Sequence, residues 1–155
     1  MFEKIIVCLD GSALAEEILP HIASESGSFG KVILLEVLAI PEASLPLGIP
    51  GSPGLPVHTD SMLEHFQKEM DETPAYLEEK AQPLRELGID VDCVVLEGNP
   101  SEAIVGYARD NEAGLIAIAT HGHTGLRQIV MGSTAEYVLK HSGKPVLLVK
   151  PQKQK

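Results

Sequence analysis

The chain has 155 residues, 44% of them hydrophobic and 22% charged, which is an ordinary composition for one globular domain with its own core. Its formal net charge of −10 excludes a general nucleic-acid binder, because such proteins turn a basic face to the phosphates. No apolar run approaches the roughly 20 residues that a membrane-spanning helix needs, so we expect no membrane span.

The N-terminal residues carry an early acidic residue and too short an apolar stretch for a signal peptide. We therefore expect a cytoplasmic protein with a single domain over residues 1–155 that ends in a short tail at 151–155. The two cysteines, Cys8 and Cys93, fall in expected strands. We expect buried, unreactive thiols there, because disulfides are rare in the cytoplasm.

The first predicted element is a buried strand. Residues Ile5–Leu9 are all apolar without alternation, which is typical of a parallel strand that is covered on both faces. The chain then turns at Asp10, and Ser12 is a suitable N-cap for a helix over Ala13–Ser24. Because proline lacks an N–H and crowds the preceding turn, Pro20 is expected to kink this helix.

A second strand is predicted over Lys31–Leu38, followed by a segment that is not expected to hold regular structure for long. Residues Pro41–Asp60 hold five prolines and three glycines, so this loop is either a lid or a disordered excursion. Helical spacing of apolar residues then predicts a helix over Ser61–Leu87. Its two prolines, Pro74 and Pro83, are expected to break or kink it.

The middle of the chain repeats the alternation of helix and strand. Gly88 is expected to cap the long helix, and a third strand follows at Val91–Leu96. Asn99 is a suitable N-cap for the next helix, because Pro100 then stands at the first position of that helix. Gly114 is expected to end that helix before a fully apolar strand at Leu115–Ala119.

A glycine-rich loop follows this strand and leads into a helix. Gly122, Gly125 and Gly132 come before Ser133 and Thr134, which open a short amphipathic helix. Glycines let the backbone approach an anion, and the helix N-terminus supplies N–H donors and a positive dipole end. This order therefore predicts a phosphate site, although the glycines would also suit a loop of no further function. It matches neither the P-loop nor the GxGxxG dinucleotide motif.

The last predicted strand is Val146–Val149, which completes five strands in alternation with helices. Such alternation predicts a doubly wound parallel sheet with right-handed crossovers. Ligands of these sheets lie beyond the carboxyl ends of the strands, at the point where the strand order reverses. The Asp10 turn and the loop from Gly122 to Ser133 are both candidates for that place, so both ends of the chain are expected to meet at one crevice.

The glycine loop resembles the motif G-x2-G-x9-G-[ST] of the universal stress protein family. Here the motif begins at Ala119, where the family has its first glycine, and continues with Gly122, Gly132 and Ser133. The segments IIVCLDGS and MGSTAEYVLKHSGKPVLLVKP also resemble that family, whereas the likeness is weak between about Pro41 and Pro83. The resemblance implies strand order 3-2-1-4-5 in the sheet.

The resemblance further implies a site for ATP, possibly with Mg²⁺, or for AMP or ADP. Asp10 and the backbone of Val37 would hold the adenosine, although Asp10 also suits a plain turn residue. The loop that starts at Ala119 would hold the phosphates, with contributions from Gly122, His123, Gly132, Ser133 and Thr134. His121 and His123 form an H-x-H pair that supplies at most two metal ligands, so no metal site is expected.

These features favour a cytoplasmic stress-response protein that acts as a nucleotide-dependent regulatory module toward an unknown protein partner. The alternative is a dimeric interaction protein without nucleotide, which Ala119 and His123 favour because both depart from the family pattern. A third hypothesis is an enzyme such as an adenylyl transferase, for which the chain is short and lacks HxGH or KMSKS-like signatures. No catalytic residues are assigned, and slow ATP hydrolysis is the most that is expected. The resemblance implies a homodimer through Val146–Val149.

Overall fold

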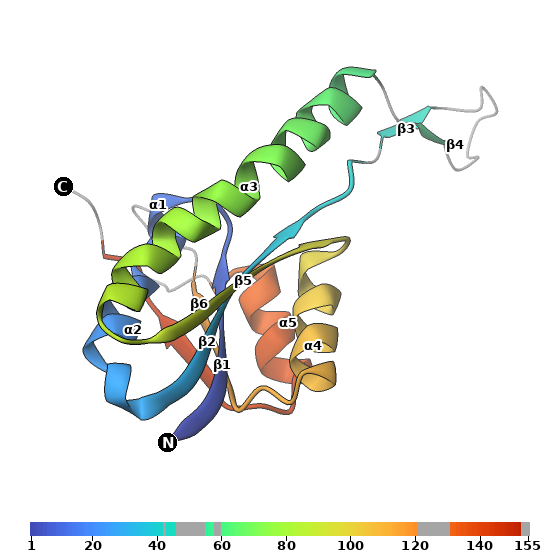
Figure 1. Ribbon diagram of the computed structural model, residues 1–155. Helices are drawn as coiled ribbons and strands as arrows, with labels where there is room; N and C mark the ends of the chain where they lie inside the picture. The colour runs from blue at the N-terminus through green and yellow to red at the C-terminus, as the bar shows by residue number, and fades with distance from the viewer. Residues whose placement is uncertain (42, 46–54, 58–59, 121–130, 153–155) are drawn as a thin grey trace.

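The protein is built around a five-stranded parallel sheet, shown in Figure 1. The structure is a computed structural model that describes residues 1–41, 43–45, 55–57, 60–120 and 131–152. Across the sheet the strands run β5-β2-β1-β6-β7, all parallel to their neighbours. Their bounds are β1 Phe2–Leu9, β2 Phe29–Leu38, β5 Asp90–Glu97, β6 Leu115–Ala119 and β7 Val146–Val149. In order of appearance this is 3-2-1-4-5, which confirms the predicted doubly wound sheet.

Helices cover both faces of the sheet (Figure 1). Their bounds are α1 Ala13–Glu16, α2 Ile18–Ser24, the 3₁₀ turn η1 Ser26–Ser28, α3 Asp60–Glu86, α4 Pro100–Asp110 and α5 Ser133–His141. The first three α-helices lie on one face, and α4 and α5 lie together on the other. Among the helices of the described residues, none combines the length and the apolar content that crossing a bilayer requires.

Two hydrophobic cores lie back to back on the sheet. Along β1, Ile5 and Val7 face the core under α1, α2 and α3, whereas Ile6 and Cys8 face the core under α4 and α5. The side chains alternate because successive residues of a strand point to opposite faces. Burial on both faces explains why the strand sequence is apolar without a break, as predicted.

A small hairpin occupies part of the segment that precedes α3. Its antiparallel strands are β3 Ala43–Leu45 and β4 Leu55–Val57, with Ser44 paired to Pro56. The sequence predicted that Pro41–Asp60 would not hold regular structure for long, and the two strands found there are three residues long each. A two-stranded ladder has free edges on which a proline is tolerated, so the prolines did not prevent pairing. The choice between a lid and a disordered excursion falls on residues 46–54, outside the described residues.

Prolines act differently in the two predicted proline-containing helices. The helix expected over Ala13–Ser24 is divided at Glu17, three residues before Pro20, so the predicted kink is confirmed. In contrast, α3 runs unbroken through Pro74 and Pro83 for 27 residues, so the expected break was wrong. Both prolines are exposed, while the opposite side of α3 packs on the sheet and holds the helix together. That packed side consists of Thr73, Leu77, Ala81 and Leu84.

Gly88 ends α3 as the sequence predicted. Its φ is +87°, in the region that glycine adopts without steric cost. The N–H of Gly88 donates to the carbonyl of Arg85 at 2.9 Å, and the N–H of Ile89 donates to the carbonyl of Leu84 at 3.2 Å. These two bonds form a Schellman motif, which satisfies the last carbonyls of the helix.

The end of α4 uses the same motif without glycine. Glu112 has φ +53°, and its N–H donates to the carbonyl of Arg109 at 3.2 Å. The N–H of Ala113 donates to the carbonyl of Ala108 at 3.0 Å. The prediction that Gly114 ends this helix was therefore wrong, because a non-glycine residue adopts the left-handed conformation two positions earlier.

Candidate functional site

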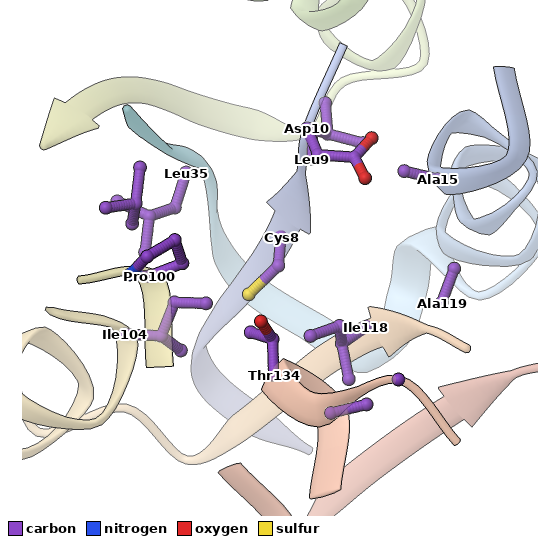
Figure 2. A pocket seen from close by; sticks show the side chains of 13 residues that line it. Cys8, Leu9, Asp10, Ala15, Leu35, Pro100, Ile104, Ile118, Ala119 and Thr134 are labelled. Carbon is purple, nitrogen blue, oxygen red and sulfur yellow. The ribbon is translucent and has the colours of Figure 1, made fainter. Parts of the chain in front are cut away.

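A pocket of about 250 Å³ lies at the carboxyl ends of the central strands (Figure 2). Strands β1, β2 and β6 contribute to it, together with the first residues of α4 and α5. The order β2-β1-β6 places it where the strand order reverses, the position at which doubly wound sheets bind ligands. Its lining residues are Cys8, Leu9, Asp10, Ala15, Leu35, Val37, Pro100, Ile104, Ile118, Ala119, Gly132, Thr134 and Ala135.

Asp10 stands at the tip of β1, where it both lines the pocket and holds the turn. Its Oδ1 accepts hydrogen bonds from the backbone N–H of Ser12 at 2.9 Å and from the Ser12 hydroxyl at 2.5 Å. Ser12 Oγ in turn accepts from the N–H of Ala15 at 3.1 Å, which is the predicted N-cap of α1. The two interpretations of Asp10, turn residue and pocket residue, therefore describe one side chain with two contacts.

One wall of the pocket is apolar and comes from β1 and β2. Cys8 and Leu35 are partners in the parallel register, and Val37 continues the same face of β2. Figure 2 shows the sulfur of Cys8 directed into the pocket. Burial raises the pKa of Cys8 to about 12 and that of Cys93, on β5, to about 11. Both cysteines are unpaired, and the raised pKa makes Cys8 an uncharged wall residue, as expected for a buried, unreactive thiol. Cys93 is only partly buried, so the expected burial was wrong for this residue.

The wall formed by α4 depends on the cap of that helix. Pro100 and Ile104 line the pocket from its first turn and a half. Asn99 Oδ1 accepts a hydrogen bond from the N–H of Glu102 at 3.1 Å, so the predicted N-cap is confirmed. This cap fixes where α4 begins and therefore where its first side chains enter the pocket.

The opposite wall comes from the end of β6 and the start of α5. Ala119, Gly132 and Thr134 line the pocket there, whereas Ser133 is exposed and does not. Gly132 is the N-cap residue, and no side chain caps the helix. The first N–H groups of an α-helix have no partner within the helix, and its N-terminus carries a partial positive charge. Anion-binding donors therefore stand at this side of the pocket.

The remaining residues of the expected phosphate loop are not placed. Gly122 and His123 belong to residues 121–130, outside the described part of the chain, and so does His121. Their contact with a ligand stays a prediction. Within the part that is described, no group of three His, Cys, Asp or Glu side chains is arranged to hold a metal ion.

The pocket combines three kinds of surface. Its walls are mainly apolar, Asp10 is the one charged residue among the described lining residues, and Thr134 adds a hydroxyl beside the helix N-terminus. Apolar walls suit a flat ring, a carboxylate accepts hydrogen bonds from hydroxyl groups, and a helix N-terminus attracts an anion. The arrangement therefore suits one ligand that carries a flat ring, hydroxyl groups and an anionic group.

Several lining residues were missed by the sequence analysis because they look like ordinary core. Cys8, Leu35 and Ile118 lie within apolar strand runs, and Ile104 and Ala135 lie on the buried faces of their helices. A usable signal was the pairing of neighbouring strands. Once β1 and β2 are aligned in parallel, residues that precede the Asp10 turn must lie beside their partners on β2.

Comparison with known proteins gives a consistent result over nearly the whole chain. The model of the universal stress protein family matches residues 1–150. Universal stress protein MJ0577 of Methanocaldococcus jannaschii is 33% identical in an alignment of 162 positions that covers 97% of this chain and 96% of that relative. A solved structure of MJ0577 superposes with a TM-score of 0.74, at 28% identity over 99% of each chain.

Two further solved structures of similar fold contain an adenine nucleotide. A universal stress protein family member from Arabidopsis thaliana with AMP bound has a TM-score of 0.62 at 16% identity, covering 97% of this chain and 92% of that one. A universal stress protein in complex with cAMP has a TM-score of 0.62 at 19% identity, covering 96% of each chain. At these identities the likeness concerns the fold.

Proposed function

The chain belongs to the universal stress protein family, and on that premise we propose that it binds an adenine nucleotide in the pocket between β1 and β6. Binding makes it a cytoplasmic, nucleotide-dependent regulatory module in the stress response, with a surface that a protein partner recognises. The observation that carries the proposal is the meeting of Asp10, Val37 and the N-terminus of α5 around one pocket. The AMP-bound and cAMP-bound relatives of the same fold support it.

Each part of the nucleotide has a matching surface in the pocket. Adenine lies against the apolar wall that includes Cys8 and Leu35, with the backbone of Val37 at its edge. The ribose hydroxyls donate to the carboxylate of Asp10, which the Ser12 turn already orients. These contacts do not depend on the number of phosphates, so AMP, ADP and ATP all fit this part of the site.

The phosphates face the start of α5. Gly132 brings the backbone close to them, while the N–H groups at Ser133 and Thr134 and the hydroxyl of Thr134 donate hydrogen bonds. Gly122 and His123 complete this part of the proposed site. When ATP binds with Mg²⁺, the ion partly neutralises the phosphates, which helps in a protein whose net charge is −10.

Replacing Gly132 by aspartate tests the proposal. A carboxylate at the N-cap of α5 repels the phosphates but is a favourable N-cap residue, so the fold is expected to survive. In titration calorimetry with AMP, ADP and ATP, we expect Gly132→Asp to weaken binding by roughly 100-fold or more, as expected when like charges oppose each other in a partly buried site. Unchanged affinity, with unchanged circular dichroism, would count against the proposed phosphate position.

A nucleotide-free interaction protein is the second candidate, and Ala119 is the observation that favours it. Its methyl group stands in the pocket lining at the position where the family motif has glycine. If the wild-type chain shows no binding heat with any of the three nucleotides, Ala119→Gly is the variant to titrate next. Binding that appears only in this variant would assign the wild type to the nucleotide-free group.

We also propose that two copies pair through β7. This strand is at the edge of the sheet, and Leu147 and Leu148 are 37% and 36% exposed. An exposed apolar edge strand is unfavourable unless another strand pairs with it. Light scattering is expected to give the mass of a dimer, and Leu147→Glu is expected to give a monomer. A monomeric wild type would remove the dimer while leaving the nucleotide site unaffected.

A further inference from the structure

Glu36 is a buried carboxyl group beside the pocket that the proposed function does not use. It lies on β2 within the apolar run VILLEVL and is 7% exposed. Among the described residues, no hydrogen-bond partner approaches its Oε2. Burying a carboxylate without a partner is unfavourable, because the charged form loses its water and gains nothing in return. The position therefore favours the neutral acid.

Glu36 lies directly behind the adenosine part of the site. The next residue, Val37, points to the opposite face of β2 and lines the pocket. On the neighbouring strand, Glu36 is in register with Leu9, which leads into Asp10. A Cβ placed on Gly11 would be 3.7 Å from Glu36 Oε1, so the carboxyl group lies against the turn that holds Asp10.

The charges that face Glu36 are mainly negative. Burial raises its pKa to about 7, and repulsion by Asp10 from the β1 turn and by Glu69 from α3 adds to the shift. The group therefore changes its charge near neutral pH, whereas an ordinary glutamate is ionised well below that range.

The nearby polar residues of α1 and α3 are engaged with one another. Tyr76 donates its hydroxyl to Glu16 at 2.7 Å, and Lys80 lies 3.4 Å from the other oxygen of Glu16. The pKa of Tyr76 is raised by its burial, by Glu16, and more weakly by Glu36 and Asp10, so Tyr76 stays neutral in the relevant range. Lys80 thus pairs with Glu16, and on the same helix Glu69 lies 3.6 Å from His65.

We propose that Glu36 is a positioning residue of the nucleotide site. Its neutral form does not repel the Asp10 carboxylate, which can then stay charged beside the ribose. Binding of an adenine nucleotide is therefore accompanied by uptake of a proton at Glu36. A ribose that covers Asp10 removes the water that screens its charge, which strengthens the repulsion between Asp10 and Glu36. Protonation of Glu36 relieves that repulsion. The inference rests on the proposed function, because it needs a ligand on Asp10.

The direction and size of the effect follow from linkage. In the free protein Glu36 is about half protonated at pH 7, and in the complex it is neutral, so about half a proton is taken up per nucleotide. Affinity is then expected to fall roughly tenfold as the pH rises from 6 to 8, because the protonated fraction of Glu36 in the free protein falls by that factor. Histidine side chains ordinarily change their charge near this range, and His123 of the proposed phosphate site lies outside the described residues, so the test must separate the two groups.

Titration calorimetry with AMP at pH 7, in two buffers of different ionisation enthalpy, counts the protons directly. We expect Glu36→Gln to bind AMP and to take up about half a proton less than the wild type. The AMP phosphate titrates equally with both proteins, so its contribution cancels in the difference. Equal proton uptake by wild type and Glu36→Gln would overturn the inference.

Three variants serve as controls. Glu69→Gln removes a like charge outside the pocket, so the midpoint of the affinity–pH profile is expected to move to lower pH. Glu97→Gln makes the same chemical change on an exposed residue of β5 and is expected to behave as wild type.

In a His123→Gln background, the difference in proton uptake between the proteins with Glu36 and with Glu36→Gln is expected to remain. Loss of that difference would assign the proton to His123 and overturn the inference. A wild type that binds none of AMP, ADP and ATP would instead refute the proposed function, and this inference with it.

Discussion

Two consecutive residues of β2 show how differently the two faces of the sheet are used. Val37 is apolar and faces the pocket, whereas Glu36 is a carboxyl group and faces the packed layer under α3. We infer that Glu36 sets the charge state near the proposed nucleotide site from behind, without touching the ligand.

The same contrast extends over the rest of the two layers. Under α3 the side chains of Leu77 and Ala81 are fully buried, and packing determines stability. Under α4 and α5 the core opens at the strand ends into the pocket. Substitutions under α3 are therefore expected to change stability, and substitutions at the pocket are expected to change binding.

The largest effect on stability is expected for Leu77→Ala on α3. The side chain is 0% exposed, so its removal leaves a cavity that costs about 3 kcal/mol and lowers the Tm by roughly 10 °C. Leu87→Ala, in which the leucine is 58% exposed, is the matched control and should change stability by less than about 0.5 kcal/mol. Thermal unfolding of both variants measures the difference. Equal losses of stability would show that the packing of α3 against the sheet does not determine stability.

The next effect concerns Glu36 and stability in the absence of ligand. The pKa of Glu36 is raised in the folded state, so its neutral form stabilises the fold. This contribution is fully present below the pKa of glutamate in the unfolded chain and is lost as the pH rises through about 7. The shift from 4.5 to about 7 corresponds to about 3 kcal/mol. In urea titrations from pH 4 to 8, wild type should lose this amount relative to Glu36→Gln. Parallel curves for the two proteins would mean that Glu36 is ionised at little cost.

A smaller effect is expected at the pocket end of α4. Asn99→Ala removes the cap that accepts from Glu102, which costs about 1 kcal/mol. Because Pro100 and Ile104 follow directly, nucleotide affinity is expected to fall as well. Denaturant unfolding and calorimetry on the same preparation measure both quantities. A stability loss with unchanged affinity would show that the wall formed by α4 does not need its cap.

The smallest effect is expected at the other end of the same helix. Glu112 has φ +53°, so Glu112→Gly removes steric strain and should raise stability by about 0.5–1 kcal/mol. This end lies away from the pocket lining, so nucleotide affinity should stay the same. Unfolding curves that show a loss of stability would mean that the flexibility of glycine in the unfolded chain outweighs the strain.

The sequence predicted the fold well because strand burial and helix capping are local signals. The bounds of β6 and β7, the cap at Asn99 and the Schellman glycine at Gly88 follow from residue type and spacing. The strand order required the family resemblance, because periodicity along the chain does not say which strands are neighbours. Once that order is known, Asp10 and the start of α5 must meet.

Other features depend on tertiary contacts that no local pattern shows. Glu36 stands out in its strand, yet the sequence does not show that α3 covers it or that Asp10 and Glu69 face it. The left-handed conformation of Glu112 goes against residue preference, and it accompanies the two hydrogen bonds that end α4. The continuity of α3 through Pro74 likewise follows from packing on the sheet, which outweighs the lost hydrogen bond.

The central claim is that the pocket between β1 and β6 holds an adenine nucleotide. The most direct test is to purify the protein without added nucleotide, denature it, and identify any released small molecule by chromatography and mass spectrometry. We expect AMP, ADP or ATP in an amount approaching one per chain, and little or none from Gly132→Asp prepared in the same way. A wild-type protein that releases no nucleotide and shows no thermal shift with AMP, ADP or ATP and Mg²⁺ would contradict the claim.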